Sequence, residues 1–336
     1  MTETAANVPP PSALPVSGPK NCSSRLTAMG ILMIIGGVFC ALMALMIPAM
    51  MALQQAIPAA RANVMPLRMM LPNILFYTIA AAFWIWMGIG SIKARRWAPA
   101  VILAGSWMWL VCGVVALPLV IILLPKALSA GAGATALPAA AVVVVTIVTG
   151  IICLFMYIVI PALLILCYRG PGVKGTCELR NPAPSWTDSC PLPLLAMILM
   201  LGGMAITLPG CALGGYPLPF FGRFVGGWAA ELAYLLAAGL AALAARGFYR
   251  RQVAAWWGTV ALLAIFCHSV CSTITKAGLV GYYQDMGLAK EQLATYAKMM
   301  SAMEPEMLIF TLAWCIAIIG YLVWLRRYFM PVRESV

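Results

Sequence analysis

The chain has 336 residues, of which 64% are hydrophobic and 9% are charged, and its formal net charge is +12. A soluble domain carries roughly 25% charged residues, so the composition excludes a globular protein with an ordinary polar surface. Barrel strands alternate apolar and polar residues, whereas the apolar runs of this chain are long and unbroken. We therefore expect an all-α fold, a polytopic transmembrane helix bundle that lies in a lipid bilayer.

Residues 1–25 are rich in proline, serine and alanine and lack the apolar centre of a cleavable signal. We interpret them as a disordered cytoplasmic tail. Eight later segments are apolar over the roughly 20 residues that a membrane crossing needs. These segments are 26–53, 71–92, 98–124, 139–168, 194–213, 226–245, 253–275 and 307–324. The fifth is interrupted near its end by Pro209 and Gly210.

Lysine and arginine are distributed unevenly between the segments that join these spans. With the N-terminus in the cytoplasm, 14 of the 21 basic residues lie on the inner side and 7 on the outer side. Because cytoplasmic loops carry such an excess, we expect both termini in the cytoplasm and the chain in the plasma (inner) membrane. The stretch GIGSIKARRWA (88–98) resembles a helix end of many small bacterial membrane proteins, which implies no function. No loop is long or basic enough to predict a nucleic-acid partner.

The spans form two sets of four, 26–168 and 194–327, joined by a cytoplasmic linker, 169–193, and followed by a tail, 328–336. The linker is rich in proline and glycine and is expected to be extended. The first and fifth spans begin with similar residues, LTAM (26–29) and LLAM (194–197), and each has a glycine pair further on, 36–37 and 202–203. The second and sixth spans end in a glycine, Gly90 or Gly247, followed by basic residues. These likenesses predict a parallel duplication into two four-helix halves, with chance similarity as the alternative.

Small residues line one face of the sixth span. Ala229, Ala233, Ala237, Ala241 and Ala245 recur at every fourth position. Such a stripe lets a neighbouring backbone approach closely. It predicts a helix partner within the bundle, or a homo-oligomer formed through this face.

The long outer loop before the last span is expected to contain an amphipathic helix near 288–303. Leu293, Tyr296, Met300 and Met303 recur there at three- and four-residue spacing. This pattern is typical of a helix that lies on the outer surface or caps the bundle.

Two ionisable residues, Glu231 and His268, fall inside predicted spans, where such groups are costly and indicate function. Both lie in the outer third of the membrane at similar depth. Cys271, Ser272 and Thr275 share the helical face of His268. These five residues predict a small polar cavity in which Glu231 and His268 handle a proton, a cation or a polar ligand. The alternative is a structural hydrogen-bonded pair, or a glutamate that stays wet near the headgroups.

The eleven cysteines are mostly single residues within spans, where cysteine acts as a small apolar residue. Cys177 and Cys190 in the linker match no zinc-site spacing. No cofactor or metal is predicted, and the HExxH, GxSxG and Walker A motifs are absent from the sequence. Methionine thioethers bind Cu(I), although methionine more often fills gaps in cores. The methionines near the outer face are Met46, Met50, Met51, Met65, Met69, Met70, Met286, Met299, Met300, Met303 and Met307.

The sequence therefore predicts a non-enzymatic role in binding, sensing or transport, served by the outer half of the bundle. A membrane-embedded enzyme that uses Glu231 and His268 is the alternative, and a copper transporter is the third. Broken helices at mid-membrane would favour transport. The interior prolines considered, Pro118, Pro161 and Pro209, are expected near helix ends, which weakens that hypothesis.

Overall fold

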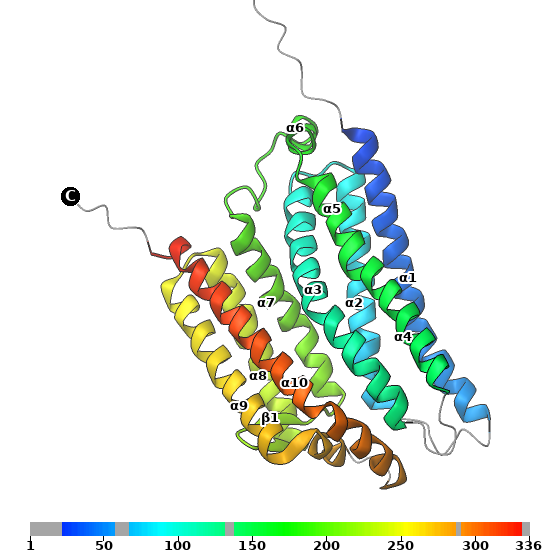
Figure 1. Ribbon diagram of the computed structural model, residues 1–336. Coiled ribbons are helices and arrows are strands. Elements are labelled where there is room, and N and C mark those ends of the chain that lie inside the picture. Colours follow the sequence, from blue (N-terminus) through cyan, green and yellow to red (C-terminus); the bar gives the residue numbers. More distant parts are fainter. Residues whose placement is uncertain (1–21, 58–66, 132–137, 287–289, 331–336) are drawn as a thin grey trace, which may run out of the picture.

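The computed structural model of the protein describes residues 22–57, 67–131, 138–286 and 290–330. Within these ranges eight helical segments are long and apolar enough to cross a membrane, and they form an all-α bundle (Figure 1). The predicted fold class is therefore confirmed. The fifth predicted span is one continuous helix despite Pro209. Residues 1–21 and 331–336, which belong to the two predicted tails, lie outside the described residues.

Two helix groups lie side by side in the bundle (Figure 1). The first group comprises α1 (Ser23–Ala56), α2 (Leu67–Ile92), α3 (Ala98–Gly131), α4 (Ala139–Leu154), the π-helical turn η2 (Phe155–Val159) and α5 (Ile160–Tyr168). The short helix α6 (Pro171–Arg180) follows. The second group comprises α7 (Leu192–Leu213), the strands β1 (Leu218–Phe220) and β2 (Arg223–Val225), α8 (Gly227–Tyr249), α9 (Val253–Asp285), α10 (Lys290–Leu325) and the 3₁₀ turn η3 (Arg326–Tyr328).

The two ends of the bundle differ (Figure 1). The start of α1, helix α6 and the end of α10 lie at one end, which we call the α6 end. The antiparallel hairpin β1–β2 lies at the opposite end, which we call the hairpin end. The start of α1 and the end of α10 lie at the same end because the number of spans is even.

Buried side chains concentrate toward the α6 end in two clusters. One includes Leu26 and Val101 of the first group, and the other includes Phe248 of the second group. Helix α7 contributes to both, since Leu195 packs in the first cluster and Leu194 in the second. The two groups are thus joined by shared packing near the α6 end.

Helices α1 and α2 approach each other through glycines. A Cβ atom added to Gly30 would lie 2.7 Å from the carbonyl oxygen of Gly88, and one added to Gly88 would lie 2.7 Å from that of Gly30. At Gly37 an added Cβ would lie 2.6 Å from the side chain of Ile85. Close backbone contact of this kind stabilises helix pairs in membranes through van der Waals packing.

The turns after α2 and after α8 have the same backbone geometry. Each contains a non-glycine residue with positive φ, Ala94 at 45° and Arg251 at 54°. In each, the amide of the following residue donates to a glycine carbonyl, that of Gly90 at 2.8 Å or Gly247 at 2.9 Å. This is the bonding of a Schellman helix end, which many helices share. The duplication into two halves stays a prediction, and these turns are its best structural support.

We expected an extended linker, but its first part forms the helix α6. Gly170 is extended and a proline occupies the first helical turn, where its missing N–H costs nothing. Beyond α6, the Asn181 side chain donates to the Ala94 carbonyl, and Arg251 donates to the Ser189 carbonyl, each at 2.8 Å. The linker is thereby fastened to the two equivalent turns.

The prediction that the alanine stripe of α8 is buried is wrong at its centre. Ala237 is exposed, whereas Ala241 of the stripe is buried and its other three members are partly buried. Ala230 and Ala238, which lie outside the stripe, are buried. Helix α8 packs mainly on α7. Adjacent positions on a helix differ by about 100°, so a run of alanines shows that a face is small but not how the helix is turned.

The amphipathic helix predicted near 288–303 is not separate, because α10 begins at Lys290 and continues through Pro305 into the last span. Its Leu293, Met300 and Met303 are partly buried. Residues 287–289 and the side chain of Tyr296 lie outside the described residues.

Prolines lie inside more helices than expected, although within the described residues only α9 and the fourth span have an irregular backbone. Prolines lie inside five helices, and α9 has a break at Gly278, where φ is 65°. The fourth span changes to the π-helical turn η2 just before Pro161, which cannot donate the usual backbone hydrogen bond. The prolines inside helices are Pro48, Pro72, Pro118, Pro125, Pro209 and Pro305.

Candidate functional site

The hydroxyls predicted beside His268 form hydrogen bonds to backbone carbonyls of their own helix, α9. Ser272 donates to the carbonyl of Ser269 at 3.0 Å, and Thr275 donates to that of Cys271 at 3.0 Å. His268 is exposed, and its ring lies against Phe221 of the hairpin, with centroids 5.8 Å apart. Hydroxyls that bond to their own helix need no ligand, so Ser272 and Thr275 are satisfied without one. A polar cavity at His268 stays a prediction.

Glu231 lies on an exposed face of α8, one turn from Trp228, which is 78% exposed. Within the described residues no hydrogen bond or ion pair joins Glu231 to His268. Tyr234, three residues further along α8, donates to the carbonyl of Pro217 at 3.2 Å. Glu231 is the fifth residue of α8, in its second turn. The position suits a glutamate at headgroup level.

Two of the buried polar residues of α9, Ser269 and Thr273, hold the hairpin. The Ser269 hydroxyl donates to the Pro219 carbonyl at 2.8 Å and accepts from the Phe221 amide at 3.0 Å. The Thr273 hydroxyl accepts from the Gly222 amide at 3.0 Å. Phe221 and Gly222 both have positive φ, as a tight two-residue hairpin turn requires. We call these hydrogen bonds from Ser269 and Thr273 to the hairpin the clamp. The sequence does not predict the clamp, because the strands of the hairpin are too short to be recognised.

Replacing Ser269 by alanine is expected to loosen the hairpin. The Phe221 amide and the Pro219 carbonyl would each lose a partner, which costs about 2 kcal/mol and speeds local opening roughly 30-fold. Hydrogen exchange of the Phe221 and Gly222 amides measures this opening. Ser272→Ala is the matched control, since its hydroxyl bonds only to a carbonyl of its own helix. Equal exchange in both variants would contradict the clamp.

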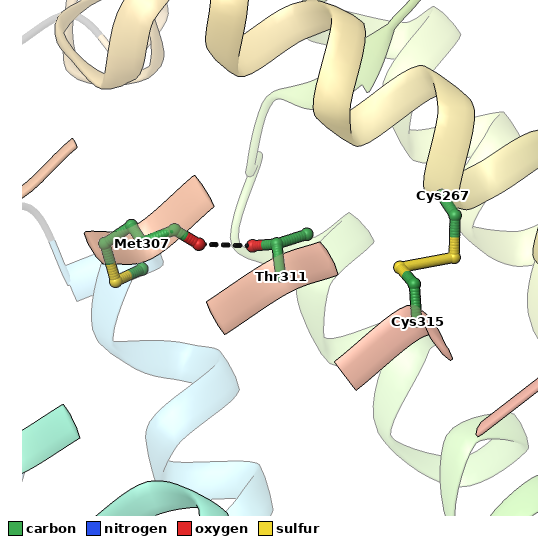
Figure 2. Close-up of a disulfide and its surroundings, with 4 residues drawn as sticks. All are labelled: Cys267, Met307, Thr311 and Cys315. Atoms are coloured by element: carbon green, nitrogen blue, oxygen red, sulfur yellow. Dashed lines mark hydrogen bonds between the residues drawn. A yellow bond between two sulfur atoms is a disulfide. The ribbon is translucent and has the colours of Figure 1, made fainter. Parts of the chain in front are cut away.

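The interpretation of the cysteines as isolated apolar residues is wrong for two of them. Cys267 of α9 and Cys315 of α10 form a disulfide (Figure 2), with Cα atoms 6.1 Å apart, a usual separation for such a bond. Cys267 is about 21 Å along α9 from its first residue and Cys315 about 15 Å from the last residue of α10. The disulfide therefore ties the two helices together near mid-span. The remaining nine cysteines are free thiols.

An apolar hollow, which we call the seam groove, lies between α3 and α10 toward the hairpin end. Its walls are almost wholly apolar, and it is open along one side. One wall comes from each helix group, so the groove lies on the boundary between them. Its lining residues are Leu119, Val120, Leu123, Leu124 and Ala127 of α3 and Met303 of α10.

An ion pair between Lys126 and Glu306 crosses the same boundary. Lys126 is next to groove residue Ala127 in sequence, and Glu306 follows Met303 by three positions, close to one helical turn. The Oε1 atom of Glu306 receives the lysine, while its Oε2 atom is buried without a donor from the described residues. In the sequence Lys126 is only one of the seven basic residues on the predicted outer side, because a partner 180 residues away leaves no signal there.

The described residues also bear on metal binding. Burial raises the pKa of Cys177 in α6 to about 11, and burial raises the pKa of Cys190 as well, so both thiols stay protonated near neutral pH. The described ranges contain no group of three or more His, Cys, Asp or Glu residues placed to hold a metal ion. Of the methionines considered for copper, Met69 is buried and Met50 is exposed, so their environments differ.

No family model, no curated protein and no solved structure matches this chain. The seam groove, the ion pair beside it and the disulfide therefore have to be interpreted by their own chemistry. Of these, the groove is the concave feature, and its walls come from both helix groups.

Proposed function

We propose that the protein is a non-enzymatic, multi-pass protein of the plasma membrane that binds a lipophilic ligand in the seam groove. The observation that carries this proposal is the groove itself, an apolar hollow that opens on the side of a bundle whose outer side chains are largely apolar. Ligand sites are typically concave and mostly apolar, with a few polar groups that orient the ligand. The Lys126–Glu306 pair, within about one helical turn of lining residues on both helices, can provide such groups.

Transport of the same ligand is the second candidate. The π-helical turn η2 and the break of α9 at Gly278 make one helix of each group irregular, and such irregular helices are common where membrane proteins move substrates. Binding is the step that sensing and transport share. An enzyme that uses Glu231 and His268 has less support, because the described residues place both side chains on exposed positions.

We place the hairpin end outside and both termini in the cytoplasm, on the distribution of lysine and arginine. Reporter fusions at Ala130 and Lys290 are expected to report the outside, and fusions at Lys174 and Glu334 the inside. The measurement is a pair of reporters that are active on opposite sides of the membrane. An outside signal at Glu334 would contradict the even number of crossings.

Replacing Ala127 by tryptophan is expected to fill the groove. Ala127 is partly buried at the groove wall, so an indole ring there occupies the space of a ligand and lowers binding about tenfold or more. The measurement is labelling of the purified protein by a phospholipid with a photoreactive acyl chain, with the labelled peptides identified by mass spectrometry. In the wild type, label is expected on the segment 119–127.

The matched control is Ala242→Trp, an exposed alanine on the lipid-facing side of α8. It adds the same ring to the surface and is expected to leave labelling of 119–127 unchanged. Wild-type label spread evenly over all exposed helices would overturn the proposed function, because it would show only general contact with lipid.

A further inference from the structure

We infer that an arginine patch at the α6 end binds an anionic phospholipid through its phosphate group. The patch comprises Arg246 and Arg250 at the end of α8 and Arg326 and Arg327 of η3. This inference goes beyond the proposed function, because the seam groove lies toward the other end of the bundle. Three observations carry it: the charges lie together, the described residues offer them no acidic partner, and they border exposed apolar helix faces.

A contact between two phenylalanines brings the two halves of the patch together. The rings of Phe248 and Phe329 have centroids 5.0 Å apart, and both side chains are buried. Every arginine of the patch is at most three residues from one of these phenylalanines in sequence. All four arginines are exposed, so a ligand can reach them. The contact therefore gathers four positive charges where the end of α8 meets η3 (Figure 1).

The charges of the patch are not compensated within the part of the chain that the structure describes. Of the described acidic residues, Glu178 and Asp188 lie at the α6 end, and both face Arg96, at 3.8 and 2.7 Å. Arg327 instead lies over the ring of Trp324, with its guanidinium carbon 4.0 Å from the centroid. A stacked guanidinium keeps N–H donors at its edge for a phosphate. Like charges repel, so an anion that binds between the arginines is stabilising.

Exposed apolar residues lie about one helical turn from the arginines. Leu243, which is 68% exposed, precedes Arg246 by three positions, and Val323, which is 56% exposed, precedes Arg326 by three. Arg246 is 19 residues beyond Gly227, the first residue of α8, which is about 28 Å along a helix. This length is close to the hydrocarbon thickness of a bilayer, about 30 Å, so the patch lies at headgroup level. A phospholipid presents both a phosphate and acyl chains there, whereas a soluble phosphate presents only the anion.

Net charge selects the class of phospholipid. Phosphatidylglycerol carries one net negative charge, whereas the ammonium of phosphatidylcholine offsets its phosphate. Four arginines without a counter-ion therefore favour phosphatidylglycerol. The cytoplasmic leaflet, where we place the α6 end, is also the leaflet in which anionic lipids attract basic segments.

The first arm of the test compares phosphatidylglycerol and phosphatidylcholine with identical acyl chains. Lipid retained by the purified full-length protein is measured by native mass spectrometry, and the wild type is expected to retain about tenfold more phosphatidylglycerol. Lipid in the seam groove contributes equally to both measurements, because the walls of the groove are apolar. The preference should shrink at high salt, which screens exposed charges. Equal retention of the two lipids would overturn the inference and leave the proposed function standing.

The second arm removes the charges of each half of the patch. One double variant carries Arg246→Gln and Arg250→Gln, and the other carries Arg326→Gln and Arg327→Gln. Each is expected to retain about tenfold less phosphatidylglycerol than the wild type and the same amount of phosphatidylcholine. Wild-type retention of phosphatidylglycerol by both double variants would overturn the patch as the binding site.

The matched control carries Lys93→Gln and Arg95→Gln. It removes two exposed positive charges from the equivalent turn after α2, at the same end of the bundle, and is expected to keep the wild-type preference. A loss equal to that of the patch variants would overturn the inference, because it would show only general attraction between anions and the α6 end.

Inorganic phosphate distinguishes a lipid from a soluble source of the same group. Phosphatidylglycerol is expected to raise the temperature of thermal unfolding of the wild type, since a ligand that binds the folded state stabilises it. Inorganic phosphate at millimolar concentration is expected to leave that temperature unchanged, because it does not contact the apolar faces. Equal stabilisation by the two would assign the patch to a soluble phosphate and overturn the lipid.

Discussion

Replacing Cys267 by serine is expected to lower the free energy of unfolding by about 2–4 kcal/mol. The disulfide closes a loop between residues 48 positions apart, and it joins α9 to α10 at mid-span. Its loss frees α9 and α10 from each other near mid-span, because the hydrogen bond from Trp256 to the Leu322 carbonyl, which also joins them, lies toward the α6 end. Thermal unfolding in detergent measures the change. Cys271→Ser, one turn away on the same helix, removes a free thiol and is expected to have a much smaller effect.

Thiol counting tests the bond itself. Denatured wild-type protein is expected to take up nine maleimides without reduction and eleven after reduction, because two of the eleven cysteines are paired. The Cys267→Ser variant should take up ten in both conditions, since Cys315 becomes free. The Cys271→Ser control should take up eight before reduction and ten after it. Eleven adducts on the unreduced wild type would show that the disulfide does not form.

The number of spans could be predicted because it depends on the local sequence alone. About 20 consecutive apolar residues suffice to cross a bilayer as a helix, whatever the neighbouring helices do. Helix α7 continues through Pro209 because a proline in its last turns disturbs few backbone bonds. The start of α10 was harder to predict, since its amphipathic segment and the last span join across Pro305 without a break in the helix.

The rotation of each helix could not be predicted in the same way. His268 and Ser269 are neighbours at the same depth, yet His268 is exposed and Ser269 is buried against the hairpin. On α8 the small residues continue around the helix, so the choice between Ala237 and Ala238 is made by the surface of α7. Periodicity gives the depth of a residue and its neighbours on one face, while tertiary packing decides which face is buried.

Pairs that join distant segments were also beyond prediction from one sequence. The disulfide between Cys267 and Cys315 and the ion pair between Lys126 and Glu306 both depend on which helices are neighbours. The glycine pairs show the same limit. Gly37 packs tightly on α2, whereas a Cβ atom at Gly203 would meet nothing within 4 Å. The similar sequences around the glycine pairs 36–37 and 202–203 therefore do not lead to similar packing.

Replacing Gly30 by alanine is expected to destabilise the α1–α2 pair by about 1–3 kcal/mol, in the range of overpacked cores. The added methyl would lie 2.7 Å from the carbonyl oxygen of Gly88, a backbone atom that cannot rotate away. The two helices must then separate, and they carry Leu26 and Met33 of the cluster near the α6 end with them. Thermal unfolding in detergent measures the loss. Gly36→Ala on the same helix is the control, because its methyl would meet only the Trp84 ring at 3.9 Å.

The control is expected to be neutral or stabilising by up to about 1 kcal/mol, since alanine has a higher helix propensity than glycine. A difference between the two variants therefore reports the helix contact and not the propensity. Gly88→Ala adds a methyl at the facing position and is expected to cost a similar amount. Once one methyl has separated the helices, the second finds more room, so the double variant should cost less than the sum of the single ones. Strict additivity, or equal losses at Gly30 and Gly36, would show that α1 and α2 do not meet at these glycines.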